Sequence, residues 1–261
     1  MLIDSHCHID LMDYDKLGGD PQSAVRYAHD NGISHMLCVS VNLEQYPNML
    51  DTINDMPMVF ASVGVHPNEH EGIDPSVAEL TELAGNEKVI AIGETGLDYF
   101  RSEGDLDWQR DRFRRHIEAA KQTGKPLIIH SREAKQDTIK LLQEENARDI
   151  GGVMHCFAED WEMAEQAMEM NFYISFSGIV TFKSATTLQD VAKRVPIDRM
   201  LVETDSPWLA PVPFRGKTNQ PAYVKHVAEF IAELRGDSLD NIAQATTDNF
   251  FTLFSTANRT V

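Results

Sequence analysis

Cysteine is scarce in this chain, and its three copies, Cys7, Cys38 and Cys156, stand far apart in the sequence. The number is odd and no two of them form a CxxC pair. The sequence therefore predicts neither a disulfide framework nor a thiolate zinc site, and we expect three reduced, packed thiols.

Long apolar runs are also missing, and none is long enough to cross a membrane. A secretory signal peptide would begin with a basic segment and an apolar stretch, whereas this chain starts with strand-like MLIDSHCHID. The composition is 42% hydrophobic and 25% charged, with a mean hydropathy of -0.32, which is typical of a soluble globular protein. We therefore expect a cytoplasmic protein without membrane contact.

Basic residues are outnumbered, with 23 Lys and Arg against 41 Asp and Glu and a net charge of -18. Such a charge argues against a broad electrostatic grip on duplex nucleic acid. It leaves room for a small anionic substrate, because bound metal ions can supply positive charge locally.

Short apolar, β-branched runs alternate along the chain with longer segments of helical character. Several runs, such as VIAIG, PLIIH and MLVET, are almost continuously apolar, as in parallel strands that are buried on both faces. The predicted strands span residues 2–8, 35–41, 58–66, 89–99, 126–132, 152–157, 172–178 and 200–208.

The clearest predicted helix spans residues 105–122, where Phe113 and Ile117 share one apolar side. The other predicted helices span residues 21–31, 43–55, 75–84, 133–145, 160–170, 185–194, 220–234 and 239–254. Eight strand-then-helix units predict an α/β fold, a single-domain (β/α)8 TIM barrel that covers residues 1–261. A doubly wound open sheet is the alternative, and no linker or repeat divides the chain.

Metal-competent side chains stand at the carboxyl ends of the predicted strands. They are His6 and His8 on the first strand, Glu94 on the fourth, His130 on the fifth, His155 on the sixth and Asp205 on the eighth. Catalytic groups of such barrels come from this end of several strands. Unrelated histidines and acids would be scattered over helices, loops and both strand ends, so the agreement predicts one shared site.

Four imidazoles and two carboxylates suit two divalent cations, with magnesium, manganese or zinc as candidates. Glu94 is the expected bridge, because its strand lies between those that carry the other ligands. Two cations about 3.5 to 4 Å apart acidify a shared water and stabilise an in-line displacement, which predicts hydrolysis. Asp205 is the expected general base as well as a ligand.

Basic side chains after the strands are candidates for holding an anionic substrate. Arg101 and Arg132 follow the fourth and fifth strands, and Arg215 and Lys217 lie on PFRGKTNQP after the eighth. Solvent-facing charges are an equally good interpretation of each one.

His66 in GVHP ends the third strand at the same rim, where substrate contact and a turn-forming role before proline both stay open. We assign surface or packing roles to the remaining histidines, His29, His35, His70, His116 and His226. Cys7 and Cys156 adjoin predicted ligands but alternate to the opposite face, so we expect them to pack against helices.

Several motifs together resemble one family. They are DSHCHID, GVHP, IGETGLDYF, IIHSREA, HCF and LVETDSPWLAPVPFRGKTNQPAYV. The chain resembles the TatD family of metal-dependent hydrolases, often described as deoxyribonucleases, over essentially its whole length. Related amidohydrolases carry a carboxylated lysine where this chain has Glu94, which favours the TatD branch.

The resemblance implies that His6, His8, Glu94 and Asp205 hold one cation and that Glu94, His130 and His155 hold the other. It also implies metal-dependent phosphodiester cleavage, commonly from a DNA 3′ end. DNA ends or single-stranded nucleic acid are then the expected substrate.

Two other functions stay open at this point. A two-metal hydrolase of this kind could act on another bond, in an aminoacyl ester, an amide or a lactone. A non-catalytic metal-binding partner protein would lack a ligand or the base, and all six predicted side chains are present. The sequence sets no oligomeric state, and a monomer is compatible with it.

Overall fold

The computed structural model describes residues 1–260, which form one sheet of eight parallel strands in chain order. The strands are β1 (Leu2–Cys7), β2 (Ile33–Cys38), β3 (Val59–Val63), β4 (Val89–Asp98), β5 (Leu127–Arg132), β6 (Gly152–Met154), β7 (Phe172–Phe176) and β8 (Met200–Val202). The sheet returns on itself where Cys7 pairs with Ser206 and the backbone N–H of His8 donates to the Ser206 carbonyl over 2.8 Å. The (β/α)8 barrel is therefore confirmed and the open sheet excluded.

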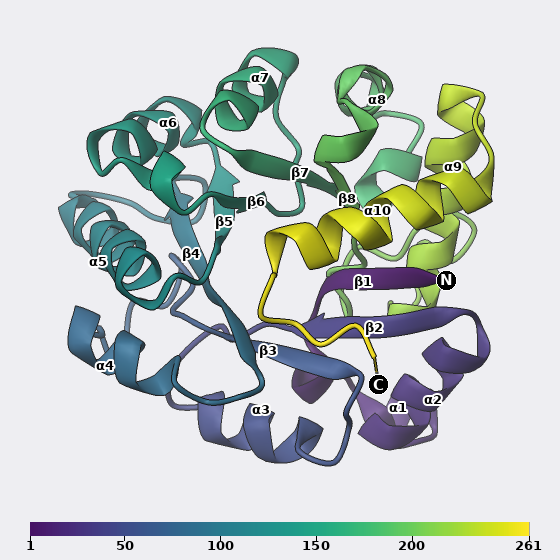
Figure 1. The fold of residues 1–261 in the computed structure, drawn as a ribbon, viewed down its shortest axis with the longest axis horizontal. Helices are drawn as coiled ribbons and strands as arrows, with labels where there is room; N and C mark the ends of the chain where they lie inside the picture. Colours follow the sequence, from purple (N-terminus) through teal and green to yellow (C-terminus); the bar gives the residue numbers. More distant parts are fainter. Residues whose placement is uncertain (261) are drawn as a thin grey trace.

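Helices surround this ring of strands on the outside, except α10, which lies across one end of it (Figure 1). They are α1 (Tyr14–Leu17), α2 (Pro21–Asp30), α3 (Tyr46–Ile53), α4 (Val77–Leu83), α5 (Asp107–Thr123), α6 (Lys135–Glu144), α7 (Trp161–Glu169), α8 (Thr186–Arg194), α9 (Val224–Arg235) and α10 (Leu239–Leu253). The nine predicted helices are confirmed within a few residues at each end. Within residues 1–260, none of these helices is long and apolar enough to cross a membrane.

Local sequence signals set the helix ends. Asp20 and Ser23 exchange side-chain and backbone hydrogen bonds in a capping box at the start of α2. Gly124 adopts a left-handed conformation, with φ +68°, and ends α5. The short helix α1 was missed, although Asp13 caps it and Gly18 ends it in the left-handed region.

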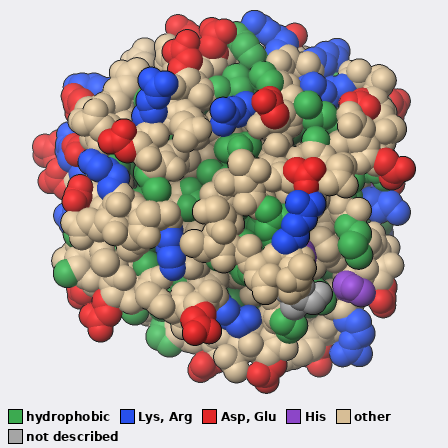
Figure 2. All heavy atoms as spheres, viewed as in Figure 1, with side chains coloured by type: hydrophobic (Ala, Val, Ile, Leu, Met, Phe, Trp, Pro, Cys, Tyr) green, Lys and Arg blue, Asp and Glu red, His purple; other side chains and the backbone are tan. Residues whose placement is uncertain are grey.

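The two ends of the barrel are different. At the amino end of the strands, Ile3, Ile90 and Leu201 form an apolar cluster with Phe250 of α10 and with Phe254, the residue that follows this helix. That helix lies across this end of the barrel (Figure 1), and charged side chains of both signs are scattered over the same face (Figure 2). Apolar packing thus closes the amino end, while polar side chains gather at the carboxyl end.

His116 of α5 links the helix layer to the rim of the barrel. Its Nδ1–H donates to the carbonyl of Arg112 over 2.8 Å, and its Nε2 accepts from the backbone N–H of Val65 over 3.0 Å. A backbone N–H can only donate, so the ring is neutral with its proton on Nδ1. Burial is the main cause that lowers the pKa of His116 to about 4. The predicted packing role of this histidine is confirmed.

We predict that His116 makes the fold acid-sensitive. The unfolded ring takes up a proton below about pH 6.5, whereas the folded ring resists protonation until about pH 4. Its contribution is therefore complete above pH 6.5 and falls by roughly 3 kcal/mol as the pH drops to about 4. Urea unfolding at several pH values should show a shallower decline for His116→Gln than for the wild type. Equal declines would contradict this account.

Candidate metal centre

Glu94 occupies the centre of a histidine cluster at the carboxyl end of the barrel. Its Oε2 lies 3.4 Å from Nε2 of His6. Its Oε1 lies 2.8 Å from Nε2 of His155, 3.1 Å from Nδ1 of His130 and 3.4 Å from Nε2 of His66. Burial alone would raise the pKa of Glu94, but the surrounding histidines outweigh it and hold the pKa well below its ordinary value. The buried carboxylate is therefore ionised.

The glycines around Glu94 allow β4 to lie close to β5. A Cβ on Gly96, which has φ +133°, would overlap the carbonyl oxygen of His130. A Cβ on Gly93 would come within 2.7 Å of the carbonyl oxygen of Ile128. The GETG motif thus combines a functional carboxylate with the backbone freedom that brings it near the fifth strand.

His6 and His8 of the β1 end converge on Asp205. Their Nε2 atoms are 3.1 Å apart and lie 3.8 Å and 3.5 Å from Oδ1 of Asp205. Nδ1 of His8 faces the carbonyl of Val39 over 2.8 Å, and a carbonyl can only accept. The proton of the neutral ring is therefore on Nδ1, which leaves a lone pair on Nε2 towards Asp205.

His130 and His155 each turn one ring nitrogen towards Glu94 and the other towards a second carboxylate. Nε2 of His130 lies 3.1 Å from Oδ2 of Asp98, and Nδ1 of His155 lies 3.2 Å from Oε1 of Glu203. Such carboxylates fix the ring and its tautomer, so that the inner nitrogen offers a lone pair to a cation.

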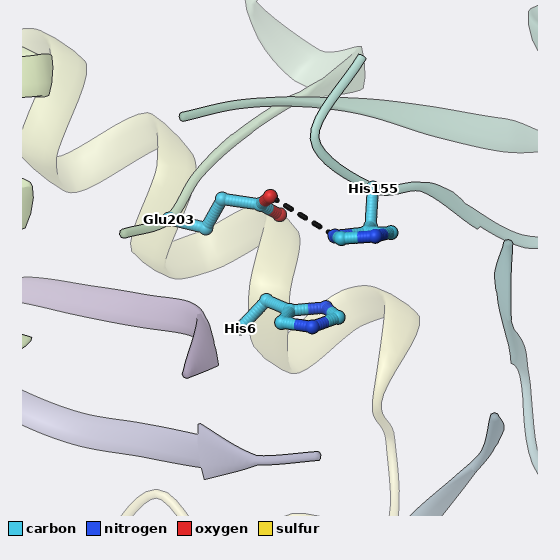
Figure 3. Close-up of side chains that lie close together, drawn as sticks. All are labelled: His6, His155 and Glu203. Carbon is cyan, nitrogen blue, oxygen red and sulfur yellow. Dashed lines mark hydrogen bonds and ion pairs between the residues drawn. The ribbon is translucent and has the colours of Figure 1, made fainter. Parts of the chain in front are cut away.

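Glu203 lies beside two stacked histidines, as Figure 3 shows. The rings of His6 and His155 are parallel, with centroids 3.9 Å apart. Oε1 of Glu203 also accepts the backbone N–H of Cys156 over 2.7 Å, which fixes the carboxylate. Burial lowers the pKa of His155, but Glu94 and Glu203 raise it well above its ordinary value.

Three groups of side chains place their donor atoms within 4.8 Å of one another, close enough to hold an ion. The groups are His6, His8 and Asp205; His66, Glu94 and His130; and His6, His155 and Glu203. Among residues 1–260, the buried Nε2 of His155 has no hydrogen-bond partner of good geometry, although Glu94 is close. Histidine nitrogens, which give up the inner proton when a metal binds, and carboxylate oxygens fit a divalent cation such as zinc or manganese.

All six predicted ligands thus meet in space, and the sequence left two of their neighbours unassigned. Asp98 and Glu203 are buried, and each holds the outer nitrogen of a histidine. The available signal was an acid directly after an apolar strand core, in GLD and in LVE. The sequence alone did not show which way the histidine rings turn.

His66 joins the cluster as a hydrogen-bond donor. Its Nδ1 accepts the backbone N–H of Asn68 over 3.0 Å, so the proton of the neutral ring is on Nε2 and points towards Glu94. Burial is the main cause that lowers the pKa of His66, which keeps the ring neutral. The bond to Asn68 supports the turn-forming role that the sequence left open, and the substrate contact of His66 stays a prediction.

The strand alternation from which we expected Cys156 to pack against helices does not hold. β6 ends at Met154, two residues earlier, so strand alternation does not extend to this cysteine. The residue is partly buried, its backbone has φ +42°, and its Sγ lies 3.2 Å from Oγ of Ser177. Cys7 and Cys38 are buried as predicted, and all three cysteines are free.

Three of the four predicted basic side chains lie against aromatic rings, and the fourth, Arg101, is exposed. Arg132 lies 3.9 Å from the ring centroid of Phe100, and Arg215 lies 4.2 Å from that of Phe182. Lys217 is 5.6 Å from the ring centroid of its neighbour Phe214. Through residue 260, none of the three forms an ion pair with a side chain of the metal centre.

We predict that Glu203 controls cation affinity through His155. Glu203→Gln removes the charge that holds the proton on the outer nitrogen, so binding of Zn²⁺ in titration calorimetry should weaken about 10-fold or more. Glu229→Gln is a matched control, because Glu229 pairs with His226 over 2.9 Å on the exposed side of α9. Equal affinities of the wild type and Glu203→Gln would refute this role.

Comparison with known proteins agrees with this geometry. A family model described as TatD related DNase matches residues 3–255. The chain is 47% identical to the uncharacterized metal-dependent hydrolase YcfH of Escherichia coli strain K12, over 97% of this chain and 95% of that protein. It is 41% identical to the uncharacterized metal-dependent hydrolase YabD of Bacillus subtilis strain 168, over 97% of this chain and 99% of that one.

A solved structure shows the same barrel. The crystal structure of YjjV, a TatD homolog from Escherichia coli K12, matches with a TM-score of 0.88 and 27% identity, over 97% of this chain and 98% of that one. The family match begins one residue into β1 and includes the other seven strands and every side chain of the metal centre. The chain therefore belongs to the TatD family of metal-dependent hydrolases.

Proposed function

We propose that this protein is a deoxyribonuclease that hydrolyses phosphodiester bonds at DNA 3′ ends and depends on divalent cations. The observation that carries the proposal is the buried Glu94 carboxylate, which has histidines on both oxygens. A carboxylate placed between two groups of nitrogen donors suits a pair of cations.

The proposed ligands follow the two sides of Glu94. His6, His8 and Asp205 complete one site, and His130 and His155 complete the other. Magnesium, manganese or zinc, when bound there, supplies positive charge to phosphoryl oxygens and makes a nearby water more acidic.

Asp205 is the proposed acceptor of the proton that the attacking water loses. Its side chain is 14% exposed, whereas that of Glu94 is only 4% exposed, so Asp205 is the carboxylate that water reaches more easily. Burial raises its pKa, but His8 and the neighbouring histidines outweigh burial and lower the pKa. The group is therefore ionised at neutral pH and able to accept a proton.

His66 is the proposed donor to a phosphoryl oxygen. Its neutral ring aims the Nε2–H into the cluster, where negative charge grows during hydrolysis. A donor that is already oriented stabilises that charge without further reorganisation.

An end of a single strand fits the charge of the protein. The net charge of -18 opposes binding along a long stretch of duplex DNA. A few basic side chains at the carboxyl end of the barrel can still hold a short single-stranded segment. Arg132 ends β5, and Arg215 and Lys217 lie on the loop after β8. We assign to these three side chains the phosphates next to the scissile bond.

We predict that the purified protein releases mononucleotides from single-stranded DNA in the presence of magnesium, manganese or zinc. Glu94→Ala and Asp205→Asn should each lower the rate at least about 100-fold while keeping the circular dichroism of the wild type. Labels on the 3′ and 5′ ends report the polarity of digestion, for which we expect the 3′ end to be lost first.

Two results contradict that proposal. One is a wild-type protein that is inert on DNA with every cation, in which case a lactone, an amide and an aminoacyl ester are the next substrates to assay. The other is full activity in the Glu94→Ala or Asp205→Asn variant, which would attribute the hydrolysis to a contaminant.

We predict a different effect for His66→Ala. Removal of a donor to the developing charge should lower kcat about 100-fold. Because Nδ1 of His66 is occupied by Asn68 and Nε2 carries the proton, the number of cations bound per chain should not change. Loss of a bound cation in elemental analysis would show that His66 is a ligand instead.

A further inference from the structure

We propose that the mouth of the barrel holds nucleobases on two aromatic platforms, Trp208 and Phe100, one on each side of the metal centre. This inference rests on the proposed nuclease function and specifies how the substrate strand is bound. Both rings are largely open to solvent, with Trp208 49% exposed and Phe100 54% exposed. Exposed aromatic rings beside a catalytic centre are typical of binding surfaces.

Trp208 borders the metal centre directly. Its ring meets that of His8 edge to face, with centroids 5.1 Å apart and an interplanar angle of 65°. His8 is a proposed cation ligand, so a base on the indole belongs to a nucleotide adjacent to the reacting phosphate.

The backbone of Trp208 is fixed before any substrate arrives. Its N–H donates to the carbonyl of Asp205 over 3.0 Å. The fully buried Asn219 donates to the carbonyls of both Trp208 and Thr204. A platform held in this way loses little conformational entropy when a base stacks on it.

Phe100 lies on the opposite side of the mouth. The eight strands follow one another around the barrel in chain order, so the loop after β4 faces the loop after β8. The backbone N–H of Phe100 donates over 3.0 Å to Asp98, the same carboxylate that holds His130. The guanidinium of Arg132 covers one face of the ring 3.9 Å from its centroid, which places a positive charge beside the platform.

Two exposed aromatic rings beside the metal centre suit single-stranded nucleic acid better than an anion without bases. Every nucleobase has a π-face, so stacking tolerates any sequence and requires unpaired bases. Stacking also supplies affinity that does not depend on a broad basic surface, which a protein of net charge -18 lacks.

The test combines enzyme variants with substrates that lack one base. Single-stranded DNA is prepared with an abasic nucleotide at either the last or the next-to-last position from the cleaved end. For intact DNA, Trp208→Ala should raise KM roughly 5- to 100-fold with a smaller change in kcat, and Trp208→Phe should recover most of the loss. For the wild type, removing the base that stacks on Trp208 should raise KM by the same factor. For Trp208→Ala, removing that base should not raise KM any further.

Phe100→Ala should likewise raise KM for intact DNA, and removing the base at the other abasic position should not raise the KM of this variant any further. Trp161→Phe is the control, because Trp161 lies on α7 under the guanidinium of Arg194, 4.0 Å away, and should behave as the wild type. A second readout does not need hydrolysis. A phosphorothioate-linked single strand with Mg²⁺ should quench tryptophan emission in the wild type and in Trp161→Phe, but not in Trp208→Phe.

The outcomes separate the two proposals. If DNA is hydrolysed but base removal and Trp208→Ala act independently, the platforms are wrong and the nuclease function stands. If quenching depends on Trp208 but no DNA is hydrolysed, the platform stands and the nuclease function fails. If there is neither hydrolysis nor quenching, both are overturned.

Discussion

The rest of this structure depends on the burial of one negative charge, the carboxylate of Glu94. An unpaired carboxylate inside a protein costs far more free energy than folding normally supplies. Here four imidazoles approach its two oxygens within 3.4 Å and provide the compensating contacts. The same contacts place nitrogen and oxygen donors where cations can be shared, so one arrangement serves both stability and chemistry.

The barrel can surround the buried Glu94 carboxylate with histidines because its strands all place side chains at the same end. His6, Glu94, His130 and His155 come from different strands or strand ends, and only a closed sheet brings them within contact distance. Stability comes mainly from elsewhere, for example from the apolar cluster under α10 at the amino end. This separation allows the carboxyl end to keep exposed aromatic rings and strongly shifted pKa values.

Much of this arrangement could be predicted from the sequence, since apolar strand cores are visible in it and the residues after them must share a rim. The six proposed ligands and the helix order follow from that rule. The roles of Asp98 and Glu203 do not follow from it, because they depend on the orientation of the histidine rings that these carboxylates contact. The alternation argument for Cys156 does not hold, because β6 ends at Met154 and Cys156 adopts a left-handed conformation. Contacts of the basic side chains depend on the directions of loops, which periodicity does not reveal.

The most direct test of this account is the number of zinc ions bound per chain, measured by native mass spectrometry. The account predicts two ions in the wild type and at most one in Glu94→Gln at the same free zinc concentration, because both sites share that carboxylate. A single ion in the wild type, or two ions in both proteins, would contradict the central role of Glu94.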